Sequence, residues 1–142
     1  MSLIESAKEL DRQYKIFNAI ADKFETGKGK LEGIAVSVKD NVCVKGMESR
    51  AGSKILDGYI PPFDATVVAK SRSEGAFIIG KTSQDEFGFG TFNVNTPYDV
   101  PLNPHDKERS AGGSSGGAAV LTAIADFPHV AIAESTGGSI SC

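Results

Sequence analysis

The sequence predicts an α/β fold in which helices flank a mixed, partly parallel central sheet. Two short, mostly apolar segments, 33–38 and 76–80, are typical of buried strands, and a helical pattern over 64–74 separates them. A second helical stretch, 115–125, precedes a third apolar strand over 129–133. Because strands and helices alternate along the chain, we expect the strands to pair largely in parallel.

Residues 1–30 are predicted to form a packing helix and a turn, and residues 31–142 the core. Apolar residues between Ser6 and Phe24 recur at three- and four-residue intervals, which indicates one amphipathic helix. Ser6 or Ser2 is available to cap it.

Four smaller features complete the expected elements. Val42–Val44 is apolar enough for a second brief strand, and Asp64 is placed to cap the helix over 64–74. Residues 84–92 are expected to start as a helix and pass into a loop. The helix over 115–125 consists of small, apolar residues and is expected to be buried on all sides.

Composition argues against several classes of function. A net charge of −3 without a basic stripe makes direct binding of this chain to nucleic acid unexpected. No apolar run approaches the length of a membrane span and no signal pattern opens the chain, so we expect no membrane partner and a cytoplasmic location. Cys43 and Cys142 are far apart and are expected to be free.

Two glycine-rich turns, Gly112–Gly117 and Thr136–Ser139, carry the clearest chemical signal. They bracket one predicted helix and strand, so Ser114, Ser115 and Ser139 are expected at one end of the sheet among unshielded backbone N–H groups. That arrangement suits acyl transfer. Neither turn contains the Gly-Lys-Ser/Thr of a phosphate-binding loop or the Gly-x-Ser-x-Gly of a nucleophile elbow.

A serine nucleophile needs a base, and the two histidines are poorly placed for that role. His105 lies in a proline-rich connector and His129 opens a strand. The known substitute is a neutral lysine, which has to be buried because free lysine titrates near about 10.4. Lys39, at the end of the first apolar strand, is the best-placed candidate; Lys81, after the second, is its rival, and spacing does not separate them.

Four ordered motifs resemble the amidase signature family over residues 33–142. They are Ser37–Asn41, Gly80–Thr82 with Asp85–Phe87, Gly112–Gly117, and Thr136–Ile140. Within that family they look most like the A subunits of the archaeal-type aspartyl/glutamyl-tRNA amidotransferases. The resemblance implies the amidase signature fold, with residues 1–142 as the N-terminal part of a single amidase domain, incomplete in this chain.

The resemblance also implies a Ser-Ser-Lys triad. Ser139 would be the acyl nucleophile and Lys39 the ultimate base, while Ser114 would relay the proton and follow a cis peptide bond. No metal is implied. The remaining implied residues are the oxyanion-hole donors Thr136, Gly137 and Gly138, and the supporting side chains Ser115 and Asp40.

The sequence departs from the family pattern at three points. Ser135 stands where an aspartate usually precedes the Thr-Gly-Gly turn, and Ser141 stands where an arginine commonly follows. The interval from Ser114 to Ser139 is also one residue longer than usual, which indicates an insertion near 126–128. We therefore expect the support of the second turn to differ locally, with the triad retained.

The implied activity is a glutaminase that supplies ammonia for transamidation of misacylated Glu-tRNA(Gln) or Asp-tRNA(Asn). This chain would need no cofactor of its own. ATP and Mg²⁺ would act in a partner B subunit, while a small C subunit would brace the pair, and tRNA would bind only through the partner. Residues 1–142 alone are expected to be inactive. Two alternatives stay open: a stand-alone amidase acting on other small amides, and a non-catalytic glycine-loop module that binds an anion.

Overall fold

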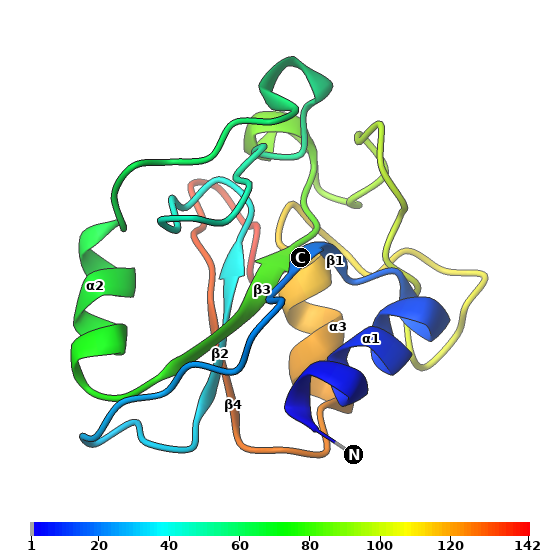
Figure 1. Ribbon diagram of the computed structural model, residues 1–142. Coiled ribbons are helices and arrows are strands. Elements are labelled where there is room, and N and C mark those ends of the chain that lie inside the picture. Colours follow the sequence, from blue (N-terminus) through cyan, green and yellow to red (C-terminus); the bar gives the residue numbers. More distant parts are fainter. Residues whose placement is uncertain (1) are drawn as a thin grey trace.

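A mixed sheet of four strands forms the centre of the computed structural model, which describes residues 2–142 (Figure 1). The strands lie in the order β1-β3-β2-β4. β2 pairs in parallel with both β3 and β4, whereas β1 runs antiparallel at the edge beside β3. The bounds are Phe17–Ile20 (β1), Ala35–Lys39 (β2), Phe77–Thr82 (β3) and His129–Ile132 (β4). The predicted α/β class with a mixed, partly parallel sheet is confirmed.

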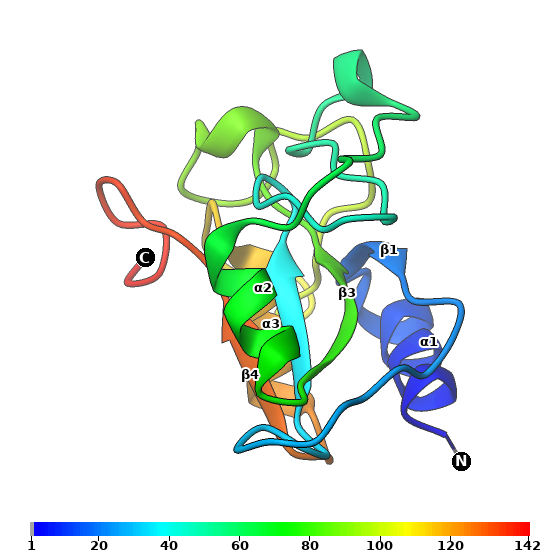
Figure 2. The same ribbon diagram turned by 60° about the vertical axis from the view of Figure 1, so that its left-hand side comes forward.

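Helices cover both faces of this sheet. α2 (Thr66–Ser73) lies against one face, and α1 (Leu3–Tyr14) and α3 (Gly116–Ile124) lie together against the other (Figures 1 and 2). Two short 3₁₀ turns, Lys54–Leu56 and Glu86–Gly88, belong to the loops. Within residues 2–142, no helix is both long and apolar enough to cross a lipid bilayer.

Alternation along β2 assigns its side chains to the two faces. Val36 and Val38 pack in one cluster with Val68 of α2. Ala35 packs on the other face in a cluster with residues of α1. Lys39 shares the parity of Ala35, so its side chain leaves the sheet on the face that α1 and α3 cover.

The helix predicted between Ser6 and Phe24 begins earlier than expected. It starts at Leu3, where the side chain of Ser2 accepts the N–H of Glu5 and the Glu5 carboxylate accepts the N–H of Ser2. This reciprocal capping box satisfies two N–H groups that have no partner inside the helix. Of the two serines available as caps, Ser2 is the one used.

The same helix also ends ten residues before Phe24, at Tyr14, and its predicted continuation is wrong. Lys15 has a left-handed backbone (φ 59°), and the Asp11 carboxylate accepts the next two N–H groups, at distances of 2.8 Å. The chain then forms β1, which pairs with β3. Part of residues 1–30 therefore joins the sheet, and the division of the chain at residue 30 stays a prediction.

Two other local expectations are wrong. Val42–Val44 is not a strand, because the N–H of Val42 donates to the carbonyl of Lys39 and closes a turn directly after β2. Asp64 does not cap α2, since its carboxylate accepts the N–H of Lys45 at 2.7 Å and pairs with Arg72. The two cysteines are free, as expected.

α3 is buried on one side only, in contrast to the prediction. Val120 and Leu121 pack in a cluster with residues of α1, whereas Ala119, Thr122 and Ala123 are exposed. These three residues line a hollow of about 370 Å³ together with apolar side chains of β4 and of the loop after it. Within residues 2–142 nothing covers that side of the helix.

The parallel strands carry three chain segments to the same edge of the sheet. β2, β3 and β4 run in one direction, so their carboxyl ends lie together, as in other open α/β sheets where ligands bind. Lys39 is the last residue of β2, and the loop after β4 contains Ser139. α3 runs back along β4, which places its first turn, after Ser114 and Ser115, at this edge (Figure 2).

Candidate active site

A continuous line of hydrogen bonds joins the lysine to the two serines. Lys39 Nζ lies 2.9 Å from Ser114 Oγ, and Ser114 Oγ lies 2.8 Å from Ser139 Oγ. Lys39 and Ser114 are fully buried, while Ser139 is half-buried. The structure therefore brings together the three residues expected to form the triad, and the outermost hydroxyl is the one that a substrate can reach.

The first glycine-rich turn holds Ser114 in place by close backbone packing. The peptide bond between Gly113 and Ser114 is cis. A Cβ atom at Gly113 would lie 2.5 Å from both the Asn93 nitrogen and an Asp85 carboxylate oxygen. Only glycine fits at that separation. The same Asp85 carboxylate accepts the N–H groups of Asn93 and Asn95, so it ties the 85–95 loop against this turn.

Gly117 likewise allows close backbone packing at the first turn of α3. A Cβ atom there would lie 2.6 Å from the Ile16 carbonyl oxygen and 2.6 Å from the Ser83 nitrogen. Its own N–H donates to the carbonyl of Ser83 at 3.2 Å. This close approach fixes the start of α3 against the residue that follows β3.

The second turn presents backbone N–H groups beside Ser139. Thr136 and Gly137 are exposed and Gly138 is half-buried. Across residues 2–142, none of these three N–H groups donates to another backbone group. The Ser139 carbonyl accepts the N–H of Ser115 at 3.2 Å, which connects the two glycine-rich turns directly. The structure therefore leaves these three N–H groups free of backbone acceptors, and their role as oxyanion donors stays a prediction.

Ser115 occupies the N-cap position of α3 without capping it. Its side chain makes no cap hydrogen bond and instead donates to the carbonyl oxygen of Glu134 at 3.2 Å. Ser115 therefore does not cap α3, although its position directly before the helix would suit a cap. Ser115 instead contacts the loop that carries Ser139. Its supporting role in the site stays a prediction.

Glu134 is a charged residue of this site that the sequence reasoning missed. Its carboxylate lies 2.7 Å from Lys39 Nζ and accepts the Asn41 side-chain amide at 3.0 Å. The hydrogen bond from Lys39 lowers the pKa of Glu134. A signal was present in the sequence: Ser135 replaces the family's usual aspartate, and Glu134 is the carboxylate one position earlier.

Asp40 and Lys81 form a separate buried cluster that does not contact the serine pair. The Asp40 carboxylate accepts hydrogen bonds from Asn18, from the Arg50 backbone and from the Gly52 backbone. Lys81 Nζ lies 3.7 Å from that carboxylate and hydrogen-bonds to Ser49 Oγ at 2.8 Å. The structure thus separates the two candidate lysines, because only Lys39 reaches Ser114.

Neither histidine nor a metal-binding cluster competes with this arrangement. His129 is the first residue of β4, at the opposite end from Ser139, and its Nε2 lies 2.9 Å from Ser37 Oγ. Burial lowers the pKa of His129 to about 4. Among residues 2–142, no group of three or more His, Cys, Asp or Glu side chains is arranged to hold a metal ion.

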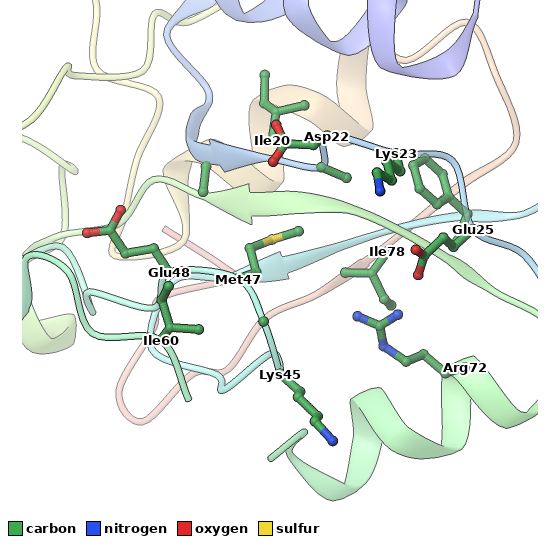
Figure 3. A pocket seen from close by; sticks show the side chains of 14 residues that line it. Ile20, Asp22, Lys23, Glu25, Lys45, Met47, Glu48, Ile60, Arg72 and Ile78 are labelled. Atoms are coloured by element: carbon green, nitrogen blue, oxygen red, sulfur yellow. The ribbon is translucent and has the colours of Figure 1, made fainter. Parts of the chain in front are cut away.

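A sizeable pocket lies away from the triad and is lined by residues of β1, β3, α2 and the 45–48 turn. Its volume is about 550 Å³. It lies between the chain after β1, the turn near Met47, and α2 (Figure 3). Arg72 reaches it from α2 and Ile78 from β3, and charged side chains of both signs surround it. None of the residues expected to be catalytic lines it, so its size does not locate the active site.

Comparison with known proteins gives a consistent result. The model of the Amidase family matches residues 2–142. The chain is 53% identical over 116 residues to the A subunit of glutamyl-tRNA(Gln) amidotransferase from Methanospirillum hungatei, covering 82% of this chain and 27% of that protein. It is 45% identical over 138 residues to the corresponding protein from Symbiobacterium thermophilum, covering 97% of this chain and 27% of that protein.

A solved structure agrees with these matches. The crystal structure of the glutamyl-tRNA(Gln) amidotransferase A subunit from Thermotoga maritima superposes with a TM-score of 0.78 at 37% identity, covering 84% of this chain and 27% of that one. The chain spans about a quarter of the length of the curated relatives it matches. The resemblance read from the four motifs is confirmed, and since the family model matches residues 2–142, the chain belongs to the amidase family.

Proposed function

We propose that this chain carries the catalytic core of a glutaminase, the A subunit of an amidotransferase that amidates misacylated tRNA. One observation carries the proposal: Lys39 Nζ, Ser114 Oγ and Ser139 Oγ lie in a line with separations of 2.9 and 2.8 Å. The similarity to named A subunits supports the choice of glutamine as the amide.

In this mechanism Ser139 Oγ attacks the carbonyl carbon of the glutamine side-chain amide. The Ser139 proton moves to Ser114 Oγ while the Ser114 proton moves to a neutral Lys39 amine, so Ser114 is regenerated. The proton then returns along the same line to the leaving nitrogen, which departs as ammonia. Water hydrolyses the acyl-enzyme and releases glutamate.

The second turn supplies the electrostatic part of the proposal. Backbone N–H groups of Thr136, Gly137 and Gly138 donate to the oxygen that becomes negative in the tetrahedral intermediate. Each such donor is worth about 3–4 kcal/mol in acyl transfer. Ser115 supports the turn through the Glu134 carbonyl and the Ser139 carbonyl. Asp40 supports the site indirectly, through the strand end on which Lys39 lies.

The partners follow from the proposed activity. Ammonia passes to a B subunit that uses ATP and Mg²⁺ to activate the misacylated tRNA, and a C subunit braces the pair. The net charge of −3 favours tRNA binding through the partner rather than through this chain. A cytoplasmic location and an overall ligase reaction of the complex belong to the same proposal.

The test compares Ser139→Ala with Ser141→Ala in the complete polypeptide that contains these residues, together with its partner subunits. Ser141 is an exposed serine two positions away, so its replacement is a matched control. We expect Ser139→Ala to reduce ammonia release from glutamine, and covalent labelling by a fluorophosphonate, by about a thousandfold or more. Ser141→Ala should change both by less than about threefold.

Three results would redirect the proposal. Equal labelling of the parent and Ser139→Ala would rule out Ser139 as the nucleophile. Ammonia release that needs no partner subunit would favour a stand-alone amidase. Retention of an anion by the protein with no labelling at all would favour the non-catalytic module.

A further inference from the structure

The Lys39 amine makes three contacts, and two of them are to one residue. Its Nζ lies 2.9 Å from Ser114 Oγ, 3.1 Å from the Glu134 carbonyl oxygen and 2.7 Å from Glu134 Oε1. Lysine ammonium has three N–H donors. In the charged state, therefore, each donor has one acceptor, and two of the three acceptors come from Glu134.

The same geometry also suits the neutral amine. A neutral amine keeps two N–H groups and carries a lone pair in the third direction. When the two oxygens of Glu134 accept those N–H groups, the lone pair faces Ser114 Oγ, where a proton has to be received. Contacts from one residue thus define the direction in which Lys39 acts as a base.

The charge of Glu134 has a second consequence. A carboxylate at 2.7 Å stabilises the ammonium form of a buried lysine. The Lys39 side chain is fully buried, whereas the Glu134 side chain is 40% exposed. The Asn41 amide holds the carboxylate from the other side at 3.0 Å, so the pair has a fixed geometry.

Other charged groups around Lys39 have partners of their own. They come from the ends of β2 and β3 and from the loops that follow, and they are Asp40, Lys81, Arg50, Asp85 and Glu86. The first turn of α3 brings only serine and glycine to Lys39. Across residues 2–142, Glu134 is the one carboxylate within ion-pair distance of this lysine.

We propose that Glu134 is a positioning residue for Lys39: its two oxygens aim the lysine at Ser114, and its charge sets the pH at which Lys39 begins to act as a base. This inference rests on the proposed function, since it assigns Lys39 the role of base. It extends that function with a residue that lies outside the Ser-Ser-Lys line.

The experiment measures the rate at which a fluorophosphonate labels Ser139 between about pH 6 and about pH 10 in the complete polypeptide with its partner subunits. Ser139 Oγ forms a bond to phosphorus, fluoride leaves, and the serine proton passes through Ser114 to Lys39. The rate therefore follows the fraction of Lys39 that is neutral.

Two variants distinguish the effect of the Glu134 charge from its effect on the orientation of the Lys39 amine. Glu134→Gln keeps the side-chain carbonyl oxygen and removes the charge, so the midpoint of the pH profile should move to lower pH by about one unit while the rate at high pH stays within about threefold. Glu134→Ala should move the midpoint similarly and also lower the high-pH rate by about tenfold, because one of the two orienting oxygens is gone. Glu32→Gln, which removes an exposed carboxylate before β2, should leave the profile unchanged.

Each outcome decides one of the two proposals. A profile of Glu134→Gln that superimposes on the parent profile, while Ser139 is still labelled, would overturn the role of Glu134 and leave the proposed function standing. Rates lowered equally at every pH would mean that Glu134 has only a structural role. If the parent is not labelled at Ser139 at all, the proposed function itself fails.

Discussion

Two buried lysines lie at or next to the carboxyl ends of neighbouring parallel strands, and they have different surroundings. Lys39 ends β2 and Lys81 lies next to the end of β3, and both are fully buried. Lys39 contacts Ser114, which in turn contacts Ser139. Lys81 contacts Ser49 and Asp40. Burial alone therefore does not distinguish the two lysines as candidate bases. What distinguishes them is the next hydrogen bond made by each serine partner.

The serine hydroxyls that contact the two lysines differ in their next hydrogen bond. Ser114 passes its hydrogen bond to another serine at the surface of the site. Ser49 Oγ donates to the Met47 carbonyl at 3.3 Å, so its hydrogen bond ends inside the fold. Burial lowers the pKa of Lys81 to about 8, which by itself would suit a base. Within residues 2–142, the hydrogen bonds of Lys81 and Ser49 do not lead to either glycine-rich turn, so we expect Lys81 to be a structural residue.

The largest expected effect tests this comparison directly. Lys39→Met and Lys81→Met each replace a buried amine by an apolar chain of similar length. We expect Lys39→Met to lower the rate of Ser139 labelling by about 10²–10⁴-fold, because the proton has no acceptor. Lys81→Met should lower it by less than about threefold once both variants are shown to be folded by circular dichroism. Comparable losses in the two variants would remove the distinction between the lysines.

The second prediction concerns pH and stability. The pKa of Lys81 is about 8 in the folded state against an ordinary 10.5, so the unfolded chain binds more protons between these values. The free energy of unfolding contributed by Lys81 should therefore rise by about 3 kcal/mol as pH increases from 8 to 10.5, and stay level below pH 8. The difference between the parent and Lys81→Met, measured by urea unfolding of the complete polypeptide at several pH values, isolates this contribution. A difference that is flat across that range would contradict it.

The smallest effect is expected at Ser49. Ser49→Ala removes the hydroxyl that hydrogen-bonds to Lys81 and should lower the free energy of unfolding by about 1–2 kcal/mol. Labelling of Ser139 should be unaffected, whereas Ser114→Ala, the matched change on the other lysine, should abolish most of it. Loss of labelling in Ser49→Ala would indicate that the two clusters are coupled.

Much of the fold was predictable from local patterns. β2, β3 and β4 are short apolar runs between turns, and α2 and α3 have helical spacing and end near the expected residues. The end of α1 was not predictable in this way. Apolar residues at three- and four-residue intervals continue past Tyr14, but the Asp11 carboxylate takes the N–H groups of Ile16 and Phe17, and β3 offers a strand partner.

For the candidate site, too, some features were predictable from the sequence and others were not. The sequence by itself determined the chemical groups: two glycine-rich turns with serines, and two lysines that each follow an apolar strand. Only the tertiary structure decided which lysine meets the serines and that Glu134 meets that lysine. The physical reason is separation along the chain, because the contact from Lys39 to Ser114 spans 75 residues and that to Glu134 spans 95. Such contacts depend on how the sheet orders its strands, and no local pattern encodes that order.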